Sequence, residues 1–187
     1  MKKTIFVLFL VSALILGSCS SMRVVHNKHR DKLQRKANRY RTFGAVAEIG
    51  EGMSQREDIA RDKARTDAYI KIGQAIQSRI DGVQSLYIKE VGDQNKSEIE
   101  DVFEKTSKVV TNTTIQGIFA VDETILINKE GVYHAYMLYA ISPRSINTKL
   151  MKELRTLQPD IYERFVVSKT YGDLEEEASL YEREILQ

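Results

Sequence analysis

The sequence predicts a single α+β domain: a sheet of about four strands with two packed helices, in the order β-α-β-α-β-β, and a C-terminal helical extension. Three observations indicate this fold. An alternating apolar run at residues 43–52 precedes alanines spaced as on a helix. Two strand-like runs flank a turn sequence at 128–131, and a proline at 143 opens further helical patterns. We therefore expect the α+β domain over residues 43–142 and a helical arm over 143–187.

The first strand and the first helix are expected to pack closely. One face of the run at 43–52 carries Ala45, Ala47 and Ile49. Gly50 and Gly52 are expected to end the strand flexibly. Ser54 and Glu57 match a capping box, which predicts the start of the helix. Its apolar stripe begins with Ala60, Ala64 and Ala68. Such small side chains let a helix lie close to a sheet.

A second strand and a second helix are expected next. The first helix is predicted to end at about Gln77, because residues 78–91 alternate in the manner of a strand. The alternating positions are Ile80, Gly82, Leu86 and Ile88. Ser97 and Glu100 form another capping box, and the helix that follows is predicted to end near Asn112.

The last two strands are expected to form a hairpin over residues 113–127 and 132–141, and His134 is interpreted as a packed histidine. In the arm, a helix is predicted to start at Ser142 and Pro143, and the chain restarts at Pro159. Asp173 and Glu176 are expected in the first turn of the final helix, where the helix dipole favours acids. The arm either covers the sheet or packs on a partner.

The N-terminal segment indicates export and lipid attachment. Lys2 and Lys3 precede an apolar run at residues 5–16, so residues 1–18 match a signal peptide. The run is shorter than the roughly 20 residues of a transmembrane helix. The lipobox is Leu16, Gly17, Ser18 and Cys19. Cys19 is the single cysteine of the chain, and an exported lone thiol is otherwise a liability. A plain secreted form, with an incidental cysteine, is the alternative.

The expected anchor fixes the compartment and the first partner. Each buried methylene contributes about 0.8 kcal/mol, so several acyl chains on Cys19 make a lasting attachment to the membrane. Ser20 is not the aspartate that commonly retains lipoproteins in the inner membrane, which favours the bacterial outer membrane and a periplasm-facing domain. Residues 19–42 are interpreted as the lipidated cysteine and a basic tether, either solvated or in contact with lipid phosphates.

Composition argues against nucleic-acid binding. Loss of Lys2 and Lys3 leaves 26 basic residues against 26 acidic ones, so the mature chain has no net charge. No catalytic motif is present, and we expect no enzymatic activity, no cofactor and no metal site. The acidic groups Glu98–Asp101 and 175–177 are attributed to helix starts. His26 and His29, without a third ligand, do not predict a metal site.

Four segments of the chain resemble a known family of proteins. They are the run from Gly44 to Gly52, the helix with Ala60, Ala64, Arg65 and Ala68, the run at 78–91 and the last strand at 133–141. Together with the lipobox, they resemble the LPP-twenty-type family of small envelope lipoproteins, which is similar to the flagellar outer-membrane lipoprotein P. The resemblance implies a compact α+β domain that acts in envelope assembly and scaffolding, often by self-association.

Two functions remain open at this stage. The first is a non-catalytic, membrane-anchored lipoprotein for cell-envelope scaffolding or assembly, with self-association or an envelope protein as partner. The alternative is a periplasm-facing binding module for a small ligand or a cell-wall glycan.

Overall fold

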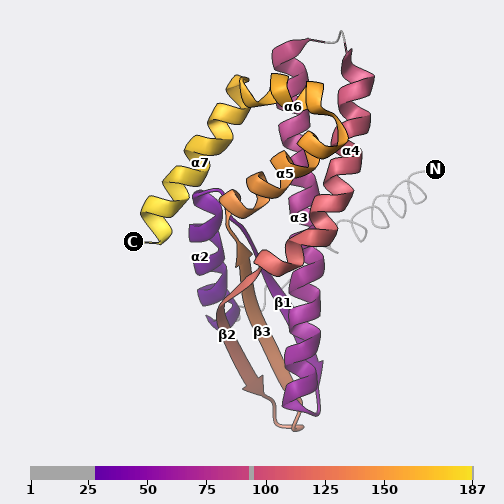
Figure 1. Ribbon diagram of the computed structural model, residues 1–187. Helices are drawn as coiled ribbons and strands as arrows, with labels where there is room; N and C mark the ends of the chain where they lie inside the picture. Colours follow the sequence, from indigo (N-terminus) through magenta and orange to yellow (C-terminus); the bar gives the residue numbers. More distant parts are fainter. Residues whose placement is uncertain (1–27, 93–94, 187) are drawn as a thin grey trace, which may run out of the picture.

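The computed structural model describes residues 28–92 and 95–186 and shows an α+β fold (Figure 1). In chain order the elements are α2 (Lys28–Thr42), β1 (Val46–Ser54), α3 (Glu57–Val91), α4 (Lys96–Thr113), a 3-10 turn (Thr114–Gly117), β2 (Phe119–Ile127), β3 (Tyr133–Ile141), α5 (Pro143–Leu157), α6 (Pro159–Val166) and α7 (Lys169–Ile185). The α+β class is confirmed. The expected order β-α-β-α-β-β is wrong.

The sheet has three antiparallel strands in the order β1-β3-β2, where four were predicted. β3 is the central strand, paired with β1 from Val46↔Ile141 to Ser54↔Tyr133. The predicted hairpin between β2 and β3 is confirmed. At its turn the side chain of Asn128 accepts hydrogen bonds from the backbone N–H groups of Glu130 and Val132.

One of the four predicted strands is instead part of the helix α3. Residues 78–91, predicted as a strand, continue the helix that begins at Glu57. The buried side of this stretch follows a helical spacing of four, three and four residues through Ile76, Ile80, Val83 and Tyr87. Leu86, which the strand interpretation placed in one alternating register with Ile80, is 57% exposed, whereas Ile80 is 1% exposed. At about 1.5 Å per residue, α3 is about 52 Å long and runs along most of the molecule (Figure 1).

The contact between α3 and β1 consists of small residues, as the alanine spacing predicts. Ala60, Ala64 and Ala68 are fully buried. A Cβ atom added to Gly50 would lie 1.8 Å from the carbonyl oxygen of Ala64, and one added to Gly52 would lie 2.2 Å from that of Ala60. The two glycines are therefore inside the strand and allow the helix to lie on it. The expectation that they end the strand flexibly is wrong.

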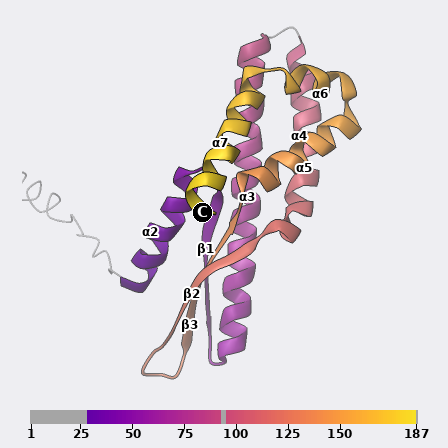
Figure 2. The same ribbon diagram turned by 60° about the vertical axis from the view of Figure 1, so that its left-hand side comes forward.

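α2 covers the opposite face of the sheet from α3 (Figure 2). Its Leu33 and Ala37 are fully buried in one cluster with Ala47, Ile49, Leu138 and Ala140. Residues 28–42, the larger part of the tether expected over residues 19–42, thus form a helix that packs on the sheet. The reason is that Leu33 and Ala37, four residues apart, give a mostly basic segment a buried side.

The C-terminal helices share the core of the molecule. Leu150, Leu154, Ile161 and Phe165 belong to the same buried cluster as Ile72, Tyr87 and Phe103 of α3 and α4. Residues 143–187 are therefore not a separate arm beside a domain at 43–142. The arm was expected to cover the sheet or to pack on a partner; these helices pack mainly on α3 and α4 within the molecule, in a cluster that also reaches Val46, Tyr139 and Ile141 of the sheet (Figure 1).

Helix ends are only partly as predicted. Ser142 caps α5, because its hydroxyl oxygen accepts from Ser145 N, and Pro143 is the first helical residue. Neither predicted capping box forms: α3 and α4 begin after Arg56 and Asn95, without a side-chain cap. Ser54 instead accepts from Arg56 N. The last helix starts at Lys169, ahead of Asp173, with Ser168 as its cap.

Candidate functional site

The lipobox residues Leu16, Gly17, Ser18 and Cys19 lie outside the described residues. In the part of the chain that the structure describes, none of the helices is long and apolar enough to cross a membrane. The same part contains no group of three His, Cys, Asp or Glu side chains placed to hold a metal ion. The described element nearest to Cys19 in the chain carries the candidate site on its surface.

That element is α2, whose outer side is a basic stripe made of Lys28, Lys32, Arg35 and Arg39. All four side chains are exposed. Their spacing of four, three and four residues places them within about 60° of one another around the helix axis. Leu33 and Ala37, which are fully buried against the sheet, lie on the other side of the helix. The packing of α2 thus turns the basic stripe directly away from the sheet.

The other cations of α2 are paired with acids of the sheet. Arg30 contacts Glu51 at 3.0 Å and Arg41 contacts Glu48 at 2.9 Å. Lys36 donates a hydrogen bond to Asp122 on β2, and this bond lowers the pKa of the Asp122 carboxyl below its usual value. These pairs tie the flanks of α2 to β1 and β2.

A small open pocket of about 200 Å³ lies beside the stripe and is lined by Lys36, Arg39, Tyr40, Val121 and Ile185. It brings together α2, β2 and the end of α7. Arg39 also donates to the backbone carbonyl of Glu184 at 3.4 Å.

Behind this pocket, the rings of Tyr40 and Tyr181 lie 6.4 Å apart. Tyr181 is fully buried and its hydroxyl has no hydrogen-bond partner among the described residues. Burial raises the pKa of this hydroxyl to about 12. Its ring therefore serves as an apolar contact that joins α7 to α2.

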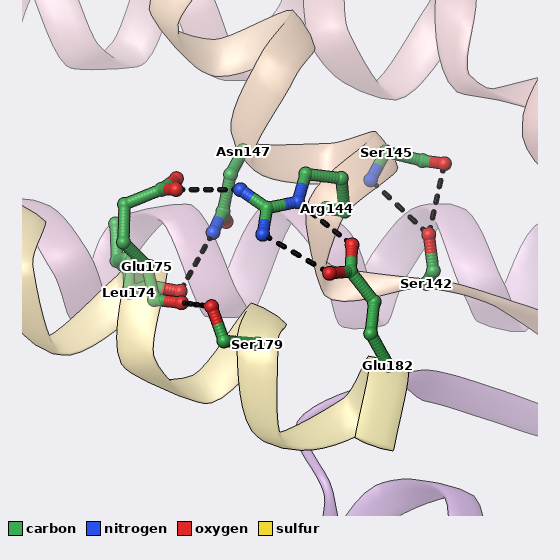
Figure 3. A network of polar contacts seen from close by, with 8 residues as sticks. All are labelled: Ser142, Arg144, Ser145, Asn147, Leu174, Glu175, Ser179 and Glu182. Atoms are coloured by element: carbon green, nitrogen blue, oxygen red, sulfur yellow. Dashed lines mark hydrogen bonds and ion pairs between the residues drawn. The ribbon is translucent and has the colours of Figure 1, made fainter. Parts of the chain in front are cut away.

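The strongest polar cluster holds α7 against α5 (Figure 3). Arg144 forms two hydrogen bonds with the Glu182 carboxylate, at 2.9 and 3.3 Å, and one with Glu175 at 2.5 Å. These bonds raise the pKa of Arg144 and lower that of Glu182. Asn147, 2% exposed, donates to the backbone carbonyl of Leu174 at 3.0 Å. The cluster is satisfied internally and joins two helices.

Two further carboxylates tie α7 to α3. Glu90 accepts from the backbone N–H groups of Lys169 and Thr170, at 2.7 and 2.9 Å, which lowers its pKa. It therefore caps the N-terminus of α7 from another helix. Glu177 pairs with Arg79, and Arg79 also donates to the carbonyl of Gly44 at 3.1 Å. Neither contact was predicted, because the partners lie about 80 to 100 residues apart in the chain.

The acidic groups singled out in the sequence prove to be structural contacts. Glu175 and Glu177 bind Arg144 and Arg79, so their assignment to a helix start is wrong. Glu98 accepts from Gln158 at 2.8 Å, and Asp101 pairs with Lys105 at 2.6 Å. The structure does not bring these carboxylates together at one site.

His26, three residues before His29 in the sequence, lies outside the described residues, which contain His29 and His134. His134 is partly buried on β3 and lines a shallow hollow of about 150 Å³ with Glu51, Met53 and Tyr136. His29 is exposed on α2.

A second polar hollow, between the end of α4 and α5, has a structural explanation. Lys149 donates to the backbone carbonyl of Thr113 at 2.6 Å. It thereby satisfies a carbonyl at the C-terminus of α4, where the helix dipole favours a cation. Partial burial lowers the pKa of Lys149.

Comparison with protein-family models, curated proteins and solved structures finds no match to this chain. The resemblance to the LPP-twenty-type lipoproteins therefore stays a prediction from the sequence, and the basic stripe of α2 is the candidate binding surface among the described residues.

Proposed function

We propose that this chain is a lipid-anchored bacterial lipoprotein of the cell envelope, held in the outer membrane through Cys19, that scaffolds or assembles an envelope structure without catalysis. The observation that carries the proposal is Cys19 itself, which follows Leu16, Gly17 and Ser18 at the end of the signal segment. This is the arrangement of the LPP-twenty-type lipoproteins that the sequence resembles.

The charged residues of the described part support a scaffolding role, because they form contacts between helices. Arg144, Arg79 and Glu90 join helices to one another. Carboxylates that would be considered for acid–base chemistry are occupied in these contacts. What α2 presents to solvent is an extended surface rather than a substrate-sized cleft.

Replacement of Cys19 by alanine tests the anchor. The Cys19→Ala protein is expected in the soluble periplasmic fraction and without fatty-acid label, because no acyl chain can be attached. A Ser21→Ala variant, which keeps Cys19 and the whole lipobox, should remain labelled and membrane-bound. Full membrane retention of the unlabelled Cys19→Ala protein would rule out the anchor.

The solution mass tests the assembly role. The exported chain with Cys19→Ala is expected to self-associate as its concentration rises from about 1 μM to 1 mM, the range of weak to moderate affinities. Analytical ultracentrifugation measures this directly. A strict monomer across the range, together with failure to recover an envelope protein by cross-linking in intact cells, would contradict scaffolding.

One feature favours the alternative, a binding module. An open groove of about 430 Å³ between α3 and α7 has a mixed lining that includes Gly82, Val83, Leu86 and Leu174 together with the ion pair of Arg79 and Glu177. An apolar ligand in this groove should be excluded by Leu86→Lys. Equal uptake of an apolar dye by the parent and this variant would remove the support for the alternative.

A further inference from the structure

We propose that the basic stripe of α2 binds the phosphate headgroups of anionic phospholipids and holds the domain face-down on the membrane that carries its anchor. The inference deepens the proposed function and rests on it, since the lipid on Cys19 brings α2 to that membrane. The surface consists of Lys28, Lys32 and Arg35, and Arg39 extends it toward α7.

The direction of the stripe is set by the core rather than by flexible side chains. Leu33 and Ala37 are fully buried between α2 and the sheet, so α2 cannot rotate about its axis without exposing them. The salt bridges of Arg30 with Glu51 and of Arg41 with Glu48 hold both ends of the helix. Lys28 to Arg39 covers about 16 Å along the axis. A straight cationic row of this kind fits a flat anionic surface.

The charges of the stripe are available to an external anion. The cations on the flanks of α2 each have a carboxylate on the sheet, whereas Lys28, Lys32 and Arg35 form no salt bridge with the described residues. Lys32 is near enough to Asp122 for its charge to help lower the pKa of that carboxyl, to which Lys36 is bonded. Arg39 is partly engaged by the carbonyl of Glu184 and so contributes less. Because the mature chain has no net charge, this local excess is a feature of α2 and not of the whole protein.

The anchor places the stripe within reach of the surface. Eight residues lie between Cys19 and Lys28, and the nine residue steps from one to the other span at most about 32 Å when fully extended. The first cation of the stripe therefore lies within about one bilayer-core thickness of the lipid attachment point. Membrane phosphates are the anions that this geometry brings closest.

Binding through this face orders the layers of the molecule. With the stripe on the membrane, α2 is the first layer, the sheet is the second and α3 is the third (Figure 2). The side of the molecule opposite α2 then points into the periplasm.

The test uses the full mature chain with Cys19→Ala, so that binding is not masked by acylation. Sedimentation with vesicles of phosphatidylglycerol and phosphatidylcholine is compared with pure phosphatidylcholine at low salt. The Lys28→Gln, Lys32→Gln, Arg35→Gln triple variant should lose on the order of 100-fold in partitioning, about fivefold for each cation near an anionic surface. The parent should also be released at 0.5 M salt, where screening is strong.

A charge-matched control removes three exposed lysines far from α2: Lys89→Gln, Lys96→Gln, Lys152→Gln. This control should bind anionic vesicles within about twofold of the parent if the stripe acts locally. Circular dichroism should show all three proteins folded, because every substituted side chain is exposed.

The outcomes separate the two proposals. Equal binding of the stripe variant and the control, or no binding of the parent to anionic vesicles, overturns the stripe while Cys19 still anchors the lipidated protein. Vesicle binding that depends on the stripe, combined with an unlabelled Cys19 in cells, supports the stripe and overturns the anchor.

Discussion

The two ends of the molecule are built on the same helix with opposite kinds of side chains. At the sheet end, α3 contacts β1 through Ala60, Ala64 and Ala68 against Gly50 and Gly52. At the helical end, the contacts are made by large rings. The Tyr87 and Phe165 rings lie 5.0 Å apart in an edge-on arrangement, and those of Phe103 and Phe165 lie 5.6 Å apart.

The difference shows two ways to stabilise the same helix. The small residues bring backbones close and leave no space for an added atom, so the sheet end is sensitive to additions. The aromatic residues remove a large apolar area from water, so the helical end is sensitive to deletions. The experiments below test this contrast with one deletion, one addition and one change of charge.

The largest effect is expected from Phe165→Ala. Phe165 is fully buried and contacts three other rings, so its removal should lower the free energy of unfolding by about 3–5 kcal/mol. Urea unfolding measures the change. Phe119→Ala is the matched control, since Phe119 is 38% exposed, and should cost less than half as much. Similar losses in both variants would contradict the assigned role of the aromatic cluster.

A smaller but still large loss is expected from Gly50→Ala. The new methyl group would lie 1.8 Å from the carbonyl oxygen of Ala64 and 2.5 Å from the backbone nitrogen of Ala68. Because α3 must then move away from β1, the cost should reach the upper part of the range for overpacking, about 3 kcal/mol.

Gly82→Ala is the control for this addition, since nothing lies within 4 Å of the added atom and Gly82 is in the same helix. It should stabilise the protein by up to about 1 kcal/mol, the helix preference of alanine over glycine. A stable Gly50→Ala protein would mean that the sheet end is not closely packed.

The smallest effect is expected on the stability of the protein at acidic pH. The folded pKa of Glu90 is lowered from its ordinary value of 4.5, first by hydrogen bonds from the backbone of Thr170 and Lys169. Its contribution to stability is therefore complete above pH 4.5 and is lost as the pH falls through the lower, folded pKa. Glu90→Gln should flatten the decline of thermal stability below pH 4.5. Glu163→Gln, exposed on α6, should leave the decline unchanged, and equal slopes for all three proteins would contradict the role of Glu90.

Some local features were predicted correctly from the sequence, although the two capping boxes do not form. Ser142 and Pro143 start α5 as expected, and the Asn128 turn joins two strands, because each signal acts within four residues. The end of α3 was missed for a physical reason. β-branched isoleucines at 80 and 88 favour a strand locally, whereas packing against α4 and α6 selects the helical spacing of Ile80, Val83 and Tyr87.

Only part of the candidate site could be predicted from the sequence. The basic residues of α2 were evident, but their one-sided arrangement depends on Leu33 and Ala37, two apolar residues in a segment otherwise typical of a tether. Contacts such as Arg144 with Glu182 or Glu90 with Thr170 could not be predicted. They join elements that only tertiary folding brings together, and charged residues are common on any exposed helix.

The length of α3 has a consequence for how the protein unfolds. One helix supplies the buried side chains of both the sheet end and the helical end, from Ala60 to Tyr87. Neither end can melt without exposing apolar side chains on the half of α3 that it covers. We expect a single cooperative transition, with the central amides of α3 exchanging their hydrogens only through global unfolding. A force or a partner that acts at one end then changes the stability of the whole domain.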